Sequence, residues 1–458
     1  MLRKSLRSQD LQHFPPQPLA PIKMKIATKN NWKVLSMSIP ERYDITIELD
    51  KVEFDKISIG LIPNSMEDKW FAYFENGWIY ICRSWTGNLI YKANIHSLPN
   101  GNYMIKDFWA EQDKERWKID SKDEIFTSFK NQIEYLSRRS ISNPVRNAII
   151  GLTVGDILGV PVEFESRASL KESPVTQLRG FGTHNQPIGT WSDDTSLSLC
   201  LAEELGKDYN LLNIGNSFVK WCYGGHWTPY GKVFDIGMTT SRSIKRLVQG
   251  ERPDLAGDFD EGSNGNGSLM RILPLLFYIE HIKDKKDRYN VIKEISSITH
   301  AHVRSCLACY YLLEFASFVS SDYKFPLIEA YRVANHSLIE LVNELGINEE
   351  ELKKFERLTD GTISTREEKT IYSTGYVIHS LEASIWCLLT TKSYKEAVLK
   401  AVNLGGDTDT IGSITGGLAG LFYGASSIPD EWVKQIARLE DIESLIKDLS
   451  NKFEIASC

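Results

Sequence analysis

Four aspartates and two hydroxyl residues stand where two apolar stretches of the chain begin. They are Ser192, Asp193 and Asp194 before TSLSLCLAEEL, and Asp407, Asp409 and Thr410 around the start of TIGSITGGLAGLFYG. One interpretation is helix capping, because an acid at a helix start accepts from free amides and suits the helix dipole. The other is a cation site, because two acids at one helix start repel each other unless a cation or a proton separates them.

Glu163 extends this set of acids, since it lies directly after GDILGVPV, at the end of another apolar stretch. If the two helix starts and Glu163 converge, five carboxylates and two hydroxyls form one oxygen-rich site. Such a site suits magnesium or manganese, often in pairs, whereas zinc prefers histidine and thiolate ligands. The spacing alone leaves both interpretations open.

From about Asn143 onward apolar residues recur at helical spacing, which predicts helices. We therefore expect helices to position these acids. No alternation of strands and helices appears, so we expect an all-α domain over residues 143–458. Two glycine-rich stretches interrupt the pattern. The stretch 409–424 predicts a helix that packs closely on a neighbour, and NGNGSLMR (264–271) predicts a loop whose backbone closely approaches another group.

The first 142 residues have a different character. Residues 1–30 are basic and proline-rich and predict a flexible arm, within which Met24 is an alternative start. Residues 31–106 predict a small, mainly antiparallel β domain, because YDITIELDKVEF (43–54) alternates and Asn76-Gly77 separates two aromatic runs. Residues 107–142 predict a linker helix with apolar positions at Ile125, Phe129, Ile133 and Leu136. The expected fold class is therefore α+β overall.

Composition excludes several classes of function. The chain has 53 Lys and Arg against 60 Asp and Glu, a net charge of -7, which argues against nonspecific nucleic-acid binding. Its seven cysteines are an odd, dispersed set that fits a reducing compartment. We find no secretory signal and no stretch approaching the ~20 apolar residues of a membrane span. The expected location is the cytoplasm.

Several stretches, in their order along the chain, resemble the ADP-ribosylglycohydrolase family of the dinitrogenase-reductase-activating type. They are NAIIGLTVGDILGVPVEF, GTWSDDTSLSLCLAEEL, FDIGMTT, NGNGSLMRILPL, THAHVRSCLA, TGYVIHSLEASIWCL and NLGGDTDTIGSITGGLAGLFYG. The resemblance spans about residues 145–424, and it implies an orthogonal helical fold for the large domain. It also favours the cation site over capping.

The resemblance assigns roles to individual residues. It implies two magnesium ions, with manganese as the alternative, held by Ser192, Asp193, Asp194, Asp407, Asp409, Thr410 and Glu163. It implies that the adenosine and phosphates are bound by Asn266, Gly267, Ser268, Met270, His300, Tyr376 and Val377. Glu163, Asp194 and Asp235 would be the catalytic carboxylates. A serine at 192 replaces the more usual threonine and keeps the hydroxyl.

The activity implied is hydrolysis of the bond between ADP-ribose and a protein side chain, most directly arginine. Water would attack C1″ of the ribose while carboxylates stabilise the oxocarbenium-like transition state. The protein would be an enzyme acting on ADP-ribosylated proteins, and it would serve as an immunity protein against an ADP-ribosyltransferase toxin. Two alternatives stay open: a binding protein whose N-terminal region occludes the active site of such a toxin, and a hydrolase of free small-molecule conjugates.

Histidines offer a rival metal chemistry. His300 and His302 precede Cys306 and Cys309 in an HxH…CxxC arrangement. Both cysteines fall within an apolar stretch and lack a second cysteine pair, so buried structural thiols are the favoured interpretation. The remaining candidates, His184 and His226, are expected in loops, where either could line the mouth of a cleft.

Overall fold

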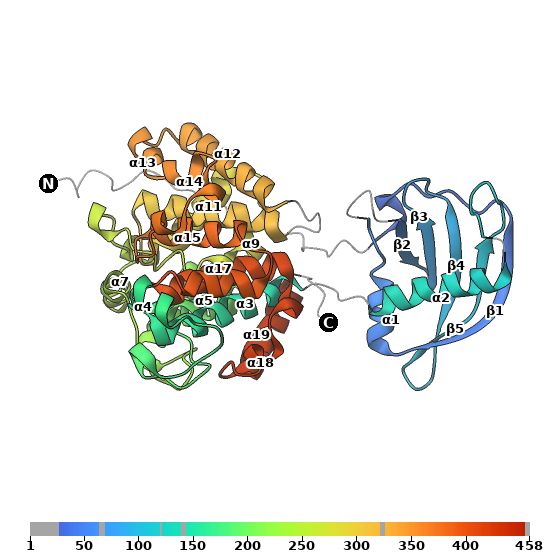
Figure 1. Cartoon of the computed structure of the whole chain (residues 1–458), viewed down its shortest axis with the longest axis horizontal. Coiled ribbons are helices and arrows are strands. Elements are labelled where there is room, and N and C mark those ends of the chain that lie inside the picture. The colour runs from blue at the N-terminus through green and yellow to red at the C-terminus, as the bar shows by residue number, and fades with distance from the viewer. Residues whose placement is uncertain (1–26, 64–68, 120, 139–142, 321–325, 454–458) are drawn as a thin grey trace.

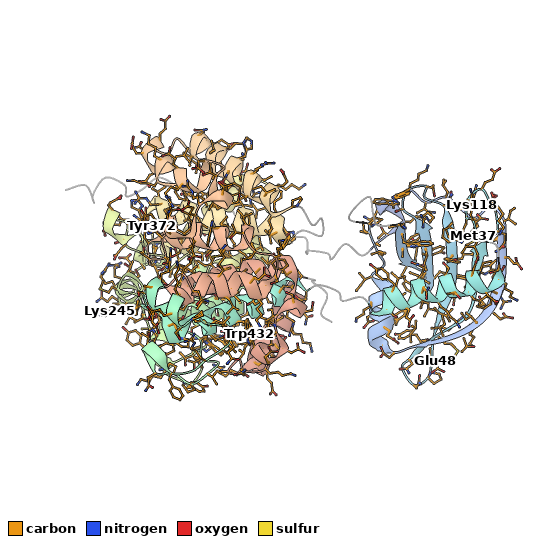
Figure 2. The ribbon with its side chains drawn as sticks, in the orientation of Figure 1. Met37, Glu48, Lys118, Lys245, Tyr372 and Trp432 are labelled. Carbon is orange, nitrogen blue, oxygen red and sulfur yellow. The ribbon has the colours of Figure 1, made fainter. Side chains whose placement is uncertain are left out.

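The structure is a computed structural model that describes residues 27–63, 69–119, 121–138, 143–320 and 326–453. These residues form two units with separate hydrophobic cores, a sheet unit up to residue 138 and a helical unit from residue 143 (Figure 1). Most of the predicted arm, residues 1–26 with Met24, lies outside the described residues. In Figure 2 the exposed side chains of Glu48 and Lys245 lie at the periphery, whereas Trp432 is buried.

The sheet unit contains five antiparallel strands, as expected. They are β1 (Pro40–Leu49), β2 (Trp70–Glu75), β3 (Trp78–Arg83), β4 (Leu89–Ser97) and β5 (Tyr103–Glu111), in the order β1-β5-β4-β3-β2. The predicted turn joins β2 and β3, with Asn76 at φ 51° and Gly77 at φ 82°. Positive φ at both positions gives the turn a twist that matches the strands.

Two helices pack on one face of this sheet, α1 (Lys51–Ser58) and α2 (Lys122–Arg138). The predicted strand over 43–54 ends early, because the Asp50 side chain accepts from the Glu53 amide and starts α1 there. The four predicted apolar positions of α2 are buried, and the rings of Phe108 and Phe129 stack at 4.0 Å. This helix is therefore part of the core of the sheet unit and not a free linker.

Residues 27–37 pack on the other face of the sheet. Ala27 is buried and its amide donates to the Ile59 carbonyl at 2.8 Å, while Trp32 stacks on Phe71 with ring centroids 6.0 Å apart. The sheet unit therefore includes the last residues of the predicted arm.

The helical unit is all-α, in agreement with the expected fold class. Its α-helices are α3 (Pro144–Gly159), α4 (Arg167–Glu172), α5 (Asp193–Leu205), α6 (Leu211–Gly224), α7 (Met238–Val248), α8 (Pro253–Ala256), α9 (Leu276–Ile279), α10 (Lys285–Ser297), α11 (Val303–Ser320), α12 (Leu327–Leu345), α13 (Glu349–Lys354), α14 (Glu356–Thr359), α15 (Val377–Leu389), α16 (Tyr394–Val402), α17 (Thr408–Tyr423), α18 (Asp430–Val433) and α19 (Leu439–Lys452).

Helices α3 and α17 are antiparallel and touch backbone to backbone along the centre of this unit. A Cβ atom on Gly155 would lie 1.9 Å from the Gly412 carbonyl oxygen, and one on Gly416 would lie 2.3 Å from the Gly151 carbonyl oxygen. Only glycine permits such an approach, which explains the glycine-rich stretch. Because the helices run in opposite directions, the end of α3 meets the start of α17.

Helix α3 and the three residues after it are, within the described part of the chain, the stretch whose hydropathy resembles a membrane span. Within the described residues, Pro144–Val162 is long and apolar enough to cross a membrane, which differs from the expectation of no such stretch. In this fold 94% of that stretch is buried inside the protein, so its apolar character is explained by its central position.

Candidate active site

Three segments converge at one end of the α3–α17 pair. The 3-10 helix η2 (Val160–Val162) continues α3 and ends at Glu163, while α5 and α17 both begin there. Asp156 of α3 joins two of these segments. Its carboxylate accepts from the Ser192 amide at 3.1 Å and from the Thr195 amide and hydroxyl at 3.0 and 2.6 Å. It therefore caps α5 from a neighbouring helix.

The hydroxyls of the two predicted pairs meet at Asp194. Both Ser192 Oγ and Thr410 Oγ1 lie 3.2 Å from Asp194 Oδ2. The other oxygen, Oδ1, is buried and has no hydrogen-bond partner among the described residues. The starts of α5 and α17 are thus in direct contact, and one carboxylate oxygen between them lacks a donor.

Glu163, Asp407 and Asp409 complete the group, which we call the carboxylate cluster together with Asp193 and Asp194. One oxygen from each of Glu163, Asp407 and Asp409 lies within 4.8 Å of the others. Capping does account for part of the sequence pattern, because the Ser192 side chain accepts from the Asp194 amide. It does not account for carboxylates from three segments in one place.

Burial and mutual repulsion disfavour the charged forms of these acids. Burial first, and then the charges of the neighbouring carboxylates, raise the pKa values of Asp193, Asp194 and Asp409 well above the ordinary range. Burial also raises the pKa of Glu163 to about 7, although a hydrogen bond from His184 opposes this shift. A group of oxygen ligands without an arginine or lysine partner among the described residues, with one buried oxygen lacking any donor, fits hard divalent cations.

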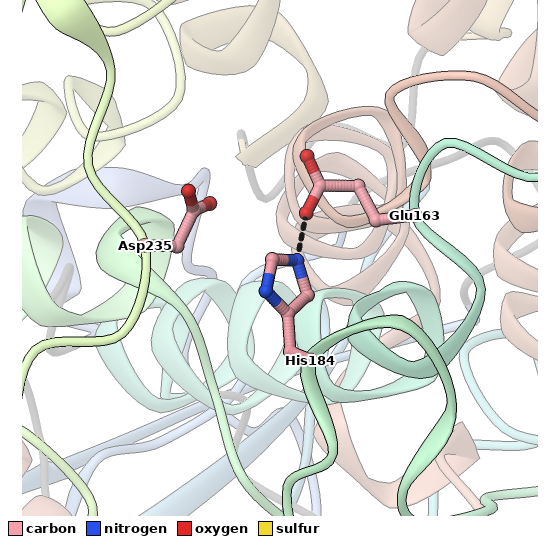
Figure 3. A group of neighbouring side chains, drawn as sticks. All are labelled: Glu163, His184 and Asp235. Atoms are coloured by element: carbon pink, nitrogen blue, oxygen red, sulfur yellow. Dashed lines mark hydrogen bonds and ion pairs between the residues drawn. The ribbon is translucent and has the colours of Figure 1, made fainter.

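A second group shares Glu163 and contains His184, which the sequence placed in a loop that could line the mouth of a cleft. His184 Nε2 hydrogen-bonds Glu163 Oε2, and Asp235 lies beside this pair with its carboxylate facing it (Figure 3). One ligand atom of each residue lies within 4.8 Å of the others. Hydrogen bonding to Glu163 raises the pKa of His184, and burial raises that of Asp235.

The loop that carries His184 is held against η2. Thr183 Oγ1 donates to the Glu163 carbonyl at 2.7 Å, and a Cβ on Gly182 would lie 1.8 Å from the Pro161 carbonyl oxygen. The sequence placed His184 in a loop that could line a cleft, but it did not indicate the contact with Glu163. Asp156 was not singled out, although it is an acid within a mainly apolar helix.

The predicted substrate loop lies against the carboxylate cluster. Asn266 Nδ2 donates to Asp407 Oδ2 and to Ser380 Oγ, both at 2.8 Å. The backbone of this loop pairs with the segment before α15, through Asn266 N to the Gly375 carbonyl and Val377 N to the Asn264 carbonyl, both at 3.0 Å. The predicted residues Asn266, Tyr376 and Val377 are therefore brought together.

The other predicted substrate residues lie beneath this loop. Ser268 is fully buried, with its hydroxyl 2.9 Å from Ser296 Oγ, and Met270 packs in the main hydrophobic core. His300 is also buried, under Gly265 and Gly267.

The rival cysteine site does not form. Cys306 and Cys309 are buried in α11, and no cysteine occurs in any of the potential metal-ligating groups of the described residues. His302 instead lies near Glu261 and Glu351, and His226 hydrogen-bonds Glu203 at 2.7 Å.

Comparisons with known proteins identify the family that the helical unit matches. A sequence model described as ADP-ribosylglycohydrolase matches residues 137–457. The ADP-ribosylarginine hydrolase Tri1 of Pseudomonas putida (strain GB-1) is 29% identical over 312 residues, 67% of this chain and 78% of that protein. The ADP-ribosyl-[dinitrogen reductase] glycohydrolase of Rhodospirillum rubrum is 26% identical over 302 residues, 65% of this chain and 91% of that protein.

A solved structure resembles the helical unit. It is described as an ADP-ribosylglycohydrolase-related protein complex, and it aligns with a TM-score of 0.55 and 28% identity over 68% of this chain and 98% of that chain. The match to the sequence model begins at residue 137, so the sheet unit precedes it almost entirely.

Proposed function

This chain belongs to the ADP-ribosylglycohydrolase family and is a hydrolase of glycosidic bonds, and from this we propose that it removes ADP-ribose from arginine side chains of modified proteins with two divalent cations. The observation that carries the proposal is the carboxylate cluster, where acids from three segments meet without an arginine or lysine partner among the described residues. The name of the Rhodospirillum rubrum relative supports protein-bound ADP-ribose as the substrate, and that of the Pseudomonas putida relative supports arginine as the acceptor.

The cations would be held by Ser192, Asp193, Asp194, Asp407, Asp409, Thr410 and Glu163. Magnesium is the proposed metal, because all of these ligands are hard oxygen donors, and manganese would fit the same set. Bound there, the cations would supply Lewis acidity and orient the ribose hydroxyls of the substrate.

Protons are moved by Glu163 and Asp235 in this proposal. Glu163, which lies in the cluster and is hydrogen-bonded by His184, can accept a proton from the water that attacks C1″. Asp235, whose pKa burial raises, can donate a proton to the leaving guanidine. The buried carboxylates around the ribose stabilise the positive charge that develops on the ring.

The test is release of ADP-ribose from an arginine-ADP-ribosylated protein in magnesium, with a serine-ADP-ribosylated protein and free ADP-ribosyl-arginine as parallel substrates. Release from the arginine-modified protein supports the proposal. Activity on ADP-ribosyl-arginine without activity on protein would favour the small-molecule alternative. No release from any of the three, with metal binding shown by calorimetry, would refute the proposed function.

The sheet unit suggests a second role, protection against an ADP-ribosyltransferase toxin. Its support is a five-stranded unit with its own core that lies almost entirely outside the match to the family. Protection could come from hydrolysis or from occlusion of the toxin by the N-terminal region. Asp409→Ala separates the two in cells that produce the toxin, because this change removes a cluster carboxylate in the helical unit only. Loss of protection assigns it to hydrolysis, and retained protection assigns it to occlusion.

A further inference from the structure

His300 has one ring nitrogen with a partner and one without. Its side chain is only 2% exposed, and Nδ1 lies 2.9 Å from Thr299 Oγ1. The opposite edge of the ring, Cε1 and Nε2, lies directly beneath the glycines of the substrate loop. A Cβ on Gly267 would be 2.7 Å from Cε1, and one on Gly265 would be 3.4 Å from Nε2. Nε2 has no hydrogen-bond partner among the described residues.

Arg271 lies behind this histidine and is fully buried. Its Nη2 donates to Thr299 Oγ1 at 2.9 Å and to the Ile295 carbonyl at 3.1 Å, and its guanidinium lies 4.7 Å from the centre of the Phe218 ring. No carboxylate pairs with it in the described part of the chain. A buried arginine without a counterion is costly, so its retention calls for a role beyond packing.

The direction of the hydrogen bonds follows from the chemistry of the three groups. A guanidinium can only donate, so Thr299 Oγ1 accepts from Arg271. The single hydroxyl hydrogen of Thr299 then has one acceptor within reach, His300 Nδ1. If Nδ1 carried the proton instead, the Thr299 hydroxyl would be a buried donor without an acceptor, which costs about 1–3 kcal/mol.

We propose that Arg271 and Thr299 are positioning residues that hold His300 as the neutral tautomer with its proton on Nε2, so that it offers one N–H donor to an acceptor atom of bound ADP-ribose. The identity of this ligand rests on the proposed function, whereas the tautomer follows from the contacts alone. Burial first, and then the nearby Arg271 cation, lower the pKa of His300 to about 3, so the ring stays neutral at physiological pH. Asn266, between the two glycines, contacts Asp407, so the loop connects this donor to the carboxylate cluster.

The tautomer can be measured on the whole protein without any substrate. In the full chain labelled with ¹⁵N in its histidine rings, a long-range ¹H–¹⁵N spectrum at pH 7 should show His300 with a protonated Nε2 and a bare Nδ1; His300→Gln identifies the signal. In Thr299→Val the ring should become a mixture of tautomers, while Thr299→Ser should restore the wild-type pattern. Ser296→Ala is the matched control, because that buried hydroxyl bonds Ser268 and the His300 carbonyl and not the ring.

Calorimetry with ADP-ribose tests whether the Nε2–H donor of His300 contributes to binding. Thr299→Val should bind ADP-ribose more weakly by the factor by which the Nε2–H population falls, about twofold for an equal mixture of tautomers, and Thr299→Ser should bind like the wild type. A wild-type spectrum with the proton on Nδ1 overturns the inference even if no variant folds. So does unchanged ADP-ribose affinity in a Thr299→Val protein whose tautomer has shifted. Neither result depends on which acceptor bond the enzyme hydrolyses.

Discussion

Two acidic groups of the helical unit have similar ligand atoms and opposite electrostatic environments. One is the carboxylate cluster, which contains Glu163, Asp407 and Asp409. The other lies elsewhere in the helical unit and contains Glu261, Glu351 and His302. In both, ligand atoms from three residues lie within 4.8 Å of one another. By composition and spacing alone, each group would be a candidate for a metal.

Arg304 distinguishes the two groups. Its guanidinium is buried and donates to Glu261 at 2.8 Å and to Glu351 at 3.0 Å, and these hydrogen bonds lower the pKa of Glu261. The group of Glu261, Glu351 and His302 thus contains its own cation, and this cation fixes the segment that leads into the substrate loop. In the carboxylate cluster burial instead raises the pKa values of four members, Glu163, Asp193, Asp194 and Asp409. A buried acidic group without its own cation is the one that needs a cation from outside.

The largest expected difference between the two groups is in activity. Asp409→Ala should lower hydrolysis by at least about a hundredfold, because even partners behind a metal ligand typically contribute 10–100-fold. The measurement is release of ADP-ribose at saturating magnesium. Asp208→Ala, which removes an aspartate with a side chain 95% exposed, should retain wild-type activity. If both variants were equally active, the carboxylate cluster would not be the catalytic site.

Removing the internal cation should instead reduce stability. Arg304→Ala should lower the free energy of unfolding by about 2 kcal/mol, because the partly buried Glu351 carboxylate loses its charged donor. Urea denaturation measures this change. The control is Arg332→Ala, whose exposed ion pair with Glu329 should change stability by no more than about 0.5 kcal/mol. If the Arg304→Ala protein were as stable as the control, Arg304 would not stabilise its acidic group, and the proposed difference between the two groups would be wrong.

Stability of the metal-free protein should fall as pH rises. Between pH 4.5, the ordinary pKa of glutamate, and about pH 7, the unfolded chain releases the Glu163 proton while the folded protein keeps it. The unfolded state then binds fewer protons, so the free energy of unfolding decreases by up to about 1.4 kcal/mol per pH unit for each such proton. Urea denaturation in EDTA should show this slope, and Glu163→Gln should reduce it. Magnesium should flatten it by binding the ionised carboxylates.

The smallest effect is expected at His184. His184→Ala should reduce turnover about tenfold, because Glu163 loses the hydrogen bond that fixes its carboxylate. The same change should move the acid limb of the pH–rate profile to higher pH, since the hydrogen bond from His184 lowers the pKa of Glu163. His184→Gln retains a donor and should recover part of the activity. A profile that does not move in His184→Ala would mean that the contact is structural only.

Local chemistry made much of this protein predictable from its sequence. Acids directly before apolar helices identified the starts of α5 and α17, and Asn76-Gly77 identified the hairpin of the sheet unit. The glycines of α17 predicted close packing. These signals are readable because a helix start, a tight turn and a close approach each demand particular residues at one point of the chain.

What failed to be predicted depends on contacts between distant segments. The apolar positions of α2 predicted a helix but not that it packs on the sheet. His184 reads as an ordinary loop residue until the loop folds against Glu163, 21 residues away. Asp156 and Ser192, 36 residues apart, meet only because α5 begins at the end of α3.

The sequence by itself therefore determined the family, the two kinds of unit and the set of acids that meet at one site. Only the tertiary structure decided which acids are left without a cation, because Arg304 reaches Glu261 and Glu351 and among the described residues no arginine or lysine pairs with the carboxylate cluster. The amino-acid composition gives the number of charged residues. The free energy of ionising each one depends on its burial and its neighbours, which exist only once the helices have packed.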